Sequence, residues 1–137
     1  MSHRKRQVGV ITQATIDLLG LTDIEANKEI CVGPTNISHM KRSHPEDFTR
    51  YGDRLEDVIQ YPHYVMLHPS DGSIRFIREY IEDGNRVLVA VRASSGGSFF
   101  ARSLYTIEVA KLESYRNTGN LVDYADENNE VINTECK

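Results

Sequence analysis

Residues 64–107, "YVMLHPSDGSIRFIREYIEDGNRVLVAVRASSGGSFFARSLYTI", decide the fold, because apolar and polar residues alternate along most of this stretch. A period of two residues is typical of half-buried β-strands. The tetrapeptide at 69–72, Pro-Ser-Asp-Gly, predicts a tight turn between two strands within 64–81. Two more strands, at 86–93 and 99–107, flank the loop "SSGGS". The stretch therefore predicts an antiparallel meander of four strands.

The segments before and after the meander have the features of helices. Helix spacing of apolar residues, proline at a first turn and glycine near an end all mark helix boundaries, and the residue before a proline is pushed out of the helical region. The predicted elements are helices at 13–19, 34–43, 45–60 and 108–119 and a strand at 28–33. The predicted fold class is therefore α+β, with N-terminal helices, then the four-stranded meander, then a C-terminal helix.

Length and composition indicate one soluble domain. A chain of 137 residues with 39% hydrophobic residues is long enough for one core. We expect a single domain over 1–118, with balanced charge, followed by an acidic and flexible tail over 119–137. No apolar run approaches the roughly 18 residues of a membrane span, and no secretory signal is present, so we expect a cytoplasmic protein without membrane contact. Cys31 and Cys136 lack the spacing of a disulfide framework or a zinc site.

The stretch "ISHMKRSHP", residues 37–45, contains two histidines that helix geometry separates. At about 100° per residue, His44 falls on the apolar side with Ile37 and Met40. We interpret His44 mainly as a helix-end residue that meets free carbonyl groups and the negative end of the helix dipole. His39 points away from this side, so it is the better catalytic candidate, although an exposed histidine is often only solvated.

Two strand registers are open for the last hairpin. A plain five-residue loop at 94–98 places Arg92 opposite Phe100 and puts the valines of 86–93 on the face of Ser103. A shorter loop or a bulge places Arg92 opposite Ala101 and on the same face as Ser103 and Tyr105. We favour the second register, because it collects polar residues on one face and the valines, Phe100 and Leu104 on the other.

That polar face suits phosphodiester chemistry. Arginine binds phosphate as a bidentate fork, histidine transfers protons near neutral pH, and hydroxyl groups orient phosphate. Arg92, Ser103 and Tyr105 on the sheet, with His39 approaching from its helix, are therefore the catalytic candidates. Whether Tyr105 faces the core instead stays open. Such a set suits cleavage of RNA by attack of the 2′-hydroxyl, without a metal or a cofactor.

The sequence also resembles the phage and mobile-element branch of the barnase–EndoU–colicin–RelE-like nuclease superfamily, over about residues 28–118. The resemblance rests on the "HMKRSHP" helix, the "HPSDGSI" turn, the arginine that ends a strand and the "ARSLY" strand. It implies a helix-then-meander fold and a metal-independent ribonuclease site. The site residues that it implies are His39, Arg92, Ser103 and Tyr105, with His44 and Arg102 as further members.

Other polar residues receive narrower roles. Lys41 and Arg42 can supply a local basic patch for substrate, as His44 and Arg102 can. In "HPSDG", Asp71 is expected to bond its own turn backbone rather than to hold a metal with His68. The first hypothesis is a toxin-like endoribonuclease that acts on RNA and has a cognate antitoxin or a host protein as a further partner. The alternative is a catalytically inactive protein of the same fold that binds RNA or inhibits a host protein, which the balanced charge favours.

Overall fold

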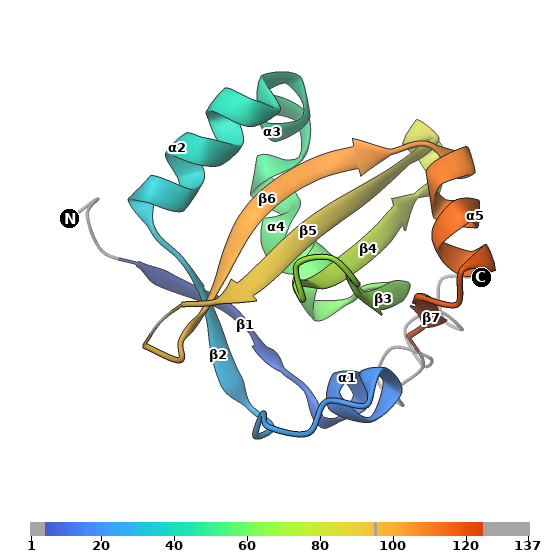
Figure 1. Ribbon diagram of the computed structural model, residues 1–137. Coiled ribbons are helices and arrows are strands. Elements are labelled where there is room, and N and C mark those ends of the chain that lie inside the picture. The colour runs from blue at the N-terminus through green and yellow to red at the C-terminus, as the bar shows by residue number, and fades with distance from the viewer. Residues whose placement is uncertain (1–4, 95, 125–137) are drawn as a thin grey trace.

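The computed structural model describes residues 5–94 and 96–124, and its centre is a mixed sheet of seven strands in the order β1-β2-β6-β5-β4-β3-β7 (Figure 1). The strands are β1 (Arg6–Ile11), β2 (Lys28–Val32), β3 (Tyr64–Leu67), β4 (Ile74–Tyr80), β5 (Asn85–Ala93), β6 (Phe99–Ile107) and β7 (Leu121–Asp123). The α-helices are α1 (Gln13–Leu19), α2 (Pro34–Ser43), α3 (Pro45–Tyr51), α4 (Leu55–Gln60) and α5 (Val109–Asn117). The α+β class predicted from the sequence is confirmed.

The predicted meander forms the middle of the sheet, because β3, β4, β5 and β6 pair antiparallel in chain order. The turn between β3 and β4 is closed as the sequence predicts. Asp71 Oδ1 accepts a hydrogen bond from the backbone N–H of Ser73 at 2.9 Å, and Gly72 adopts a φ of 71°. Glycine adopts this left-handed conformation without a steric penalty. The Asp-Gly pair therefore sets the end of the sheet beside which the site lies.

The four-stranded sheet of the prediction is wrong in extent. β2 pairs parallel with β6 through Ile30 and Phe99, β1 pairs antiparallel with β2, and β7 pairs with β3 at the other edge. The chain also begins with a strand, so the helices do not all precede the sheet. Parallel pairing joins segments far apart in the sequence, and local patterns carry no signal for such pairing.

The single helix predicted at 45–60 is also wrong. It is divided into α3 and α4 by a 3₁₀ turn at Gly52–Arg54. Glycine is a poor helix former, and Gly52 lies against the ring of Phe48, where an added Cβ would stand 3.0 Å from ring atoms. The break therefore coincides with a close contact that a larger residue would not allow.

The sheet separates two apolar clusters. On one face, Val87, Val89 and Val91 of β5 join a cluster that includes Ile16 of α1 and Val58 of α4. On the opposite face, Leu88 and Ala90 pack with Leu112 and Tyr115 of α5. The described part of the chain contains no helix long and apolar enough to cross a membrane.

The acidic tail predicted at 119–137 lies only in part within the described residues. Leu121–Asp123 form β7, and the backbone N–H of Tyr124 donates to the carbonyl of His63 at 2.9 Å. The sheet therefore extends into the segment predicted as a tail. The predicted flexibility of residues 125–137, and Cys136 with it, falls outside the described residues, whereas Cys31 is a buried free thiol.

Gly9→Ala should lower the free energy of unfolding by about 1–3 kcal/mol, the usual cost of overpacking. A Cβ at Gly9 would stand 2.7 Å from Cγ2 of Ile59, because α4 packs closely on β1. Gly96→Ala is the matched control, since a Cβ there would meet only Ser94 Oγ at 3.9 Å. Urea denaturation of both variants measures the difference. Equal stability of the two variants would contradict close packing of α4 on β1.

Candidate functional site

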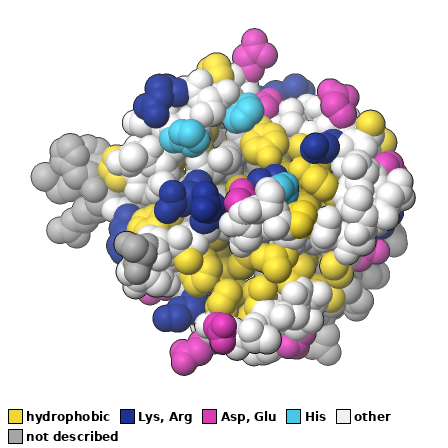
Figure 2. Space-filling model, viewed as in Figure 1, with side chains coloured by type: hydrophobic (Ala, Val, Ile, Leu, Met, Phe, Trp, Pro, Cys, Tyr) yellow, Lys and Arg dark blue, Asp and Glu magenta, His cyan; other side chains and the backbone are white. Residues whose placement is uncertain are grey.

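A pocket of about 420 Å³ lies between α2 and the face of the sheet formed by β4, β5 and β6. Its basic lining consists of His39, Arg42, Arg75, Arg92 and Arg102. Among the described residues that line it, Asp71 is the single carboxylate. Figure 2 shows Lys, Arg and His side chains gathered on this face of the molecule. We call this space the arginine pocket. It supplies a local basic excess, although the whole chain has a net charge of −4.

A β-bulge in β6 arranges the sheet side of the arginine pocket. Ala90 pairs with Ser103 and Val91 pairs with Ala101, so Arg102 is the extra residue of the bulge. Because side chains alternate along a strand, Arg92 shares its face with Ser103 and Tyr105, as predicted. The valines lie on the opposite face with Leu104.

The register of the hairpin corrects the prediction in one respect. Arg92 pairs with Phe100 and not with Ala101, so Phe100 shares the face of Arg92 and not the face of the valines. Next to the loop, Arg92 pairs with Phe100 as in the first register. Beyond the bulge, Ser103 lies on the face of Arg92, as the second register requires. The structure thus combines both registers, one on each side of Arg102.

A row of paired residues crosses three strands at the floor of the arginine pocket. Arg75 of β4 pairs with Ala90 of β5, and Ala90 pairs with Ser103 of β6. The methyl group of Ala90 lies between two longer polar side chains, and all three residues line the pocket. The small residue at the centre of this row therefore leaves the space in which a ligand can reach Arg75 and Ser103.

Three arginines of the arginine pocket have no carboxylate partner among the described residues. Arg42 and Arg92 are exposed and Arg102 is half-buried, and the ion pairs of the described chain involve none of them. The Nε of Arg102 is buried, and no described atom accepts a hydrogen bond from it. Buried donors are normally paired, so this N–H is an unpaired donor of a residue that lines the arginine pocket.

The helix α2 brings His39 to the same pocket. Gly33 is its N-cap residue, Pro34 opens it, and Asn36 Oδ1 accepts from the N–H of Gly33 at 2.9 Å. Met40 is fully buried, whereas His39 is exposed and lines the arginine pocket. His39 Nε2 lies 3.4 Å from the hydroxyl of Ser43. The predicted separation of the apolar and polar sides of this helix is therefore found.

The helix α3 fixes α2 on the edge of the sheet. β2 pairs with β6 only at Phe99 and Phe100, which leaves the rest of that edge of β6 without a strand. The carboxylate of Asp47 accepts the backbone N–H of Thr106 at 2.9 Å and contacts the hydroxyl of the same residue. This carboxylate takes the place of a neighbouring strand. It therefore holds the α2–α3 unit against β6.

His44 ends α2 as predicted, and its backbone N–H donates to the carbonyl of Met40. Its ring, however, stacks on Tyr105, with centroids 4.7 Å apart and an angle of 27° between the planes. Within the described residues, the ring makes no hydrogen bond to the free carbonyl groups of its helix. His44 therefore connects the helix to the phenol predicted in the site, although neither ring lines the arginine pocket. Lys41 also lies outside the pocket, with Nζ 5.8 Å from the centroid of Phe48.

Arg75 is the central residue that the sequence did not reveal. Its side chain is 12% exposed. Its Nε donates to Ser73 Oγ at 3.0 Å, Nη1 donates to the hydroxyl of Tyr105 at 3.2 Å, and Nη2 pairs with Asp71 Oδ2 at 3.4 Å. Arg75 could have been placed in the site only from its pairing with Ala90 in the next strand. That pairing follows from the register of the sheet, which the sequence alone does not give.

The electrostatics of this network favour a charged Asp71 and a neutral Tyr105. The pKa of Asp71 is lowered, first by the hydrogen bond from the Ser73 backbone and also by the charge of Arg75. The pKa of Tyr105 is raised by burial, against the opposing charge of Arg75. The carboxylate therefore orients Arg75, and the phenol keeps its proton. The described residues include no cluster of three or more potential metal-ligating side chains of His, Cys, Asp or Glu.

The chain matches a family model described as phage-Barnase-EndoU-ColicinE5/D-RelE like nuclease3 over residues 6–114. Among curated proteins and solved structures, none matches the chain significantly. The matched range runs from β1 into α5, so it contains every element that lines the arginine pocket. The resemblance found in the sequence is thereby confirmed: the chain belongs to the phage Barnase-EndoU-ColicinE5/D-RelE like nuclease family.

Proposed function

We propose that this chain is a metal-independent endoribonuclease of the toxin-like kind, encoded by a phage or a mobile element and active in the cytoplasm. Membership of a nuclease family supports phosphodiester chemistry. The observation that carries the proposal is the arginine pocket, in which His39 lies with arginines that lack carboxylate partners among the described residues. Such unpaired guanidinium groups suit the charge of an RNA phosphate. A cognate antitoxin would protect the host cell.

The reaction requires one proton acceptor, one proton donor and a holder for the phosphate. A base removes the proton of the ribose 2′-hydroxyl, the 2′-oxygen forms a bond to phosphorus, and the bond from phosphorus to the 5′-oxygen breaks. The leaving 5′-oxygen takes up a proton, so the products are a 2′,3′-cyclic phosphate and a free 5′-hydroxyl. We assign a proton transfer to His39, stabilisation of the phosphorane charge to Arg92, and positioning of a phosphate oxygen to Ser103.

The remaining residues hold the site in shape. Tyr105 positions the phosphate through Arg75, which its hydroxyl contacts at 3.2 Å, and His44 packs on the Tyr105 ring. Arg42 and Arg102 contact neighbouring phosphates from the walls of the arginine pocket. Lys41, which lies outside the pocket, contributes charge along the approach of the RNA. Arg42 and Arg102 thus contact the substrate directly, whereas Tyr105 and His44 hold other site residues in position.

A second candidate function is binding of RNA, or inhibition of a host protein, without catalysis. It is favoured by the state of Asp71, the single carboxylate among the described residues of the arginine pocket. Both oxygens of this carboxylate are engaged, one by Ser73 and the other by Arg75. His39 is then left without an evident second group for proton transfer. The test must therefore separate cleavage from binding.

Purified protein incubated with RNA and excess EDTA should generate fragments with 2′,3′-cyclic phosphate ends, whereas Arg92→Ala should cleave about 10²–10³-fold more slowly, the usual cost of losing one donor to a charged intermediate. Arg6→Ala is the matched control. Its side chain is exposed, pairs with Glu56 on the surface and does not line the pocket. Parallel purification of the three proteins excludes a contaminating ribonuclease, which would give equal rates in all of them.

Two outcomes decide between the candidate functions. Fragments that depend on Arg92 support the enzyme. Intact RNA that is bound by the wild-type protein and released by Arg92→Ala supports the binding protein. Because each phosphate contact contributes about −0.7 to the slope of log K against log salt for a single strand, Arg92→Ala should make that slope shallower by about 0.7. Equal slopes in Arg92→Ala and Arg6→Ala would contradict both RNA cleavage and RNA binding at this pocket.

A further inference from the structure

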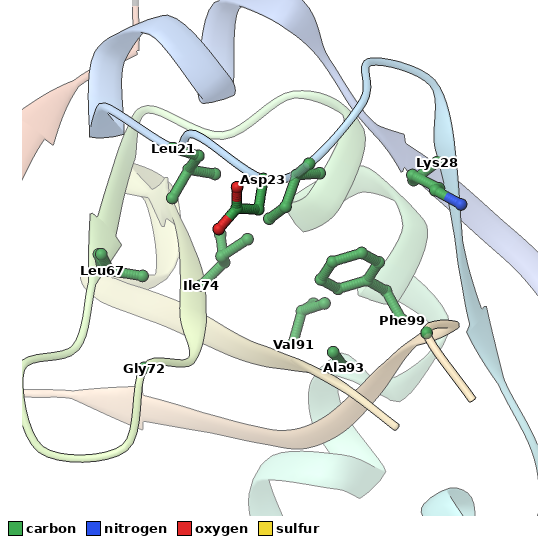
Figure 3. A pocket seen from close by; sticks show the side chains of 11 residues that line it. Leu21, Asp23, Lys28, Leu67, Gly72, Ile74, Val91, Ala93 and Phe99 are labelled. Atoms are coloured by element: carbon green, nitrogen blue, oxygen red, sulfur yellow. The ribbon is translucent and has the colours of Figure 1, made fainter. Parts of the chain in front are cut away.

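A second pocket, of about 440 Å³, lies at the same end of the sheet and is mainly apolar. The larger apolar side chains of its lining are those of Leu21, Ile24, Leu67, Ile74, Val91 and Phe99. Figure 3 shows side chains from the α1–β2 segment and from the strands of the meander pointing toward one common space. Ligand sites have typical volumes of about 300–1,000 Å³ and combine apolar walls with a few polar groups. We call this space the apolar pocket.

The apolar pocket and the arginine pocket share a rim. Ile74 and Val91 line the first, whereas their neighbours Arg75 and Arg92 line the second. Since alternate residues of a strand face opposite sides of the sheet, β4 and β5 separate the two pockets. At the strand ends the boundary passes between consecutive residues, from Asp71 to Gly72 and from Arg92 to Ala93. A ligand held by the arginines therefore needs to cross only this rim to reach the apolar pocket.

No bulky side chain stands on the rim at Gly72 or at Ala93. Gly72 has no side chain, and nothing lies within 4 Å of the place where its Cβ would be. Ala93 is exposed and has only a methyl group. In Figure 2 a hydrophobic band lies beside the basic side chains on one face of the molecule. A strand of RNA that bends over the sheet end would therefore meet no bulky side chain at Gly72 or Ala93.

The polar group of the apolar pocket limits which ligand fits it. Asp23 projects into the pocket beside Leu21, and the amine of Lys28 points away (Figure 3). Asp23 is exposed, so water solvates its carboxylate, and it takes part in none of the ion pairs of the described residues. A purely apolar occupant would bury this carboxylate without a partner, which is unfavourable. A flat ring with an exocyclic amino group at its edge satisfies both the walls and the carboxylate, whereas the N3–H of uracil lies between two carbonyl oxygens that repel a carboxylate.

We propose that the apolar pocket binds a nucleobase with an exocyclic amino group, next to the phosphate held in the arginine pocket. This inference rests on the proposed function, because the arginine pocket must hold an RNA phosphate. Proteins that read RNA sequence commonly bind unstacked bases of single strands in this manner, and carboxylates accept hydrogen bonds from amino groups of bases. The pocket would then favour adenine, guanine or cytosine over uracil, which lacks such an amine. Asp23 is the residue that sets this preference.

The test uses binding of the four nucleoside 3′-monophosphates and of orthophosphate to ¹⁵N-labelled protein. Adenosine, guanosine and cytidine monophosphates should shift the amide signals of Leu21, Asp23 and Ala93 and bind about tenfold tighter than uridine monophosphate, the lower range of one good base contact. In Asp23→Asn this preference should fall below about threefold. The affinity for orthophosphate should not change, because Asp23 does not line the arginine pocket.

Ala93→Ile provides a second variant on the rim. A larger side chain there should weaken all four nucleotides by a similar factor and leave orthophosphate unaffected, since Ala93 is exposed and lines the apolar pocket. Equal binding of uridine monophosphate, or unshifted signals at the apolar pocket, would overturn the inference in favour of an apolar side chain of a partner protein. Nucleotide preference without any RNA cleavage would instead contradict only the proposed activity.

Discussion

His39→Ala should slow RNA cleavage by about 10²–10⁴-fold, the range attributed to a positioned proton-transfer group. The affinity for an RNA with a 2′-O-methyl group at the scissile position should stay within about twofold, because such RNA binds without reacting. The imidazole of His39 is exposed, and its partner is the nearby hydroxyl of Ser43. Loss of this imidazole should therefore remove the proton transfer and leave the packing of the core unchanged. Single-turnover kinetics and binding titrations measure the two effects.

The comparison variant is His44→Phe, which keeps an aromatic ring on Tyr105 but has no nitrogen for proton transfer. It should retain cleavage within about fivefold, because stacking is worth about 0.5–1.5 kcal/mol and phenylalanine preserves most of it. The opposite result, with an inactive His44→Phe and an active His39→Ala, would contradict the assignment of the proton transfer to His39 and would move it to His44. Thermal unfolding of both variants should match the wild-type protein within about 0.5 kcal/mol.

The sequence predicts those parts of the fold that local chemistry determines. The Asp71-Gly72 turn, the hairpin strands, α2 with its proline start, and the end at His44 all depend on residues close together in the chain. The parallel pairing of Ile30 with Phe99 depends on two segments far apart. Nothing in the pattern of either segment selects the other. The extent of the sheet was therefore the part that the sequence could not determine.

The same distinction separates the site residues that were predicted from those that were missed. His39, Arg92 and Ser103 were identified by residue type and by alternation along their own helix or strands, and they do line one pocket. Arg75 was missed because its neighbours across the sheet, Ala90 and then Ser103, follow only from the register of three strands. The bulge at Arg102 moves that register by one residue. A prediction from one strand alone could not have placed this row.

Arg75→Met should lower the free energy of unfolding by about 2–4 kcal/mol and also slow RNA cleavage. The methionine keeps much of the length of the side chain but removes the bonds to Ser73, to Tyr105 and to Asp71. A buried polar group that loses its partner costs about 1–3 kcal/mol, and Arg75 is only 12% exposed. Tyr105 would lose its fixed position under the arginine pocket. Urea denaturation measures the first effect, and single-turnover cleavage measures the second.

Arg75→Lys separates the charge of this residue from its geometry. Lysine keeps one positive charge in the arginine pocket, so the salt dependence of RNA binding should stay close to that of the wild-type protein. Its single ammonium group cannot reproduce the planar fork that spans Ser73, Tyr105 and Asp71, so stability should still fall by about 1–2 kcal/mol. If Arg75→Lys instead keeps full stability while Arg75→Met loses it, the charge alone holds the network. If both variants unfold and cleave as the wild-type protein does, Arg75 does not support the site, and the positioning of Tyr105 must come from its stacking on His44.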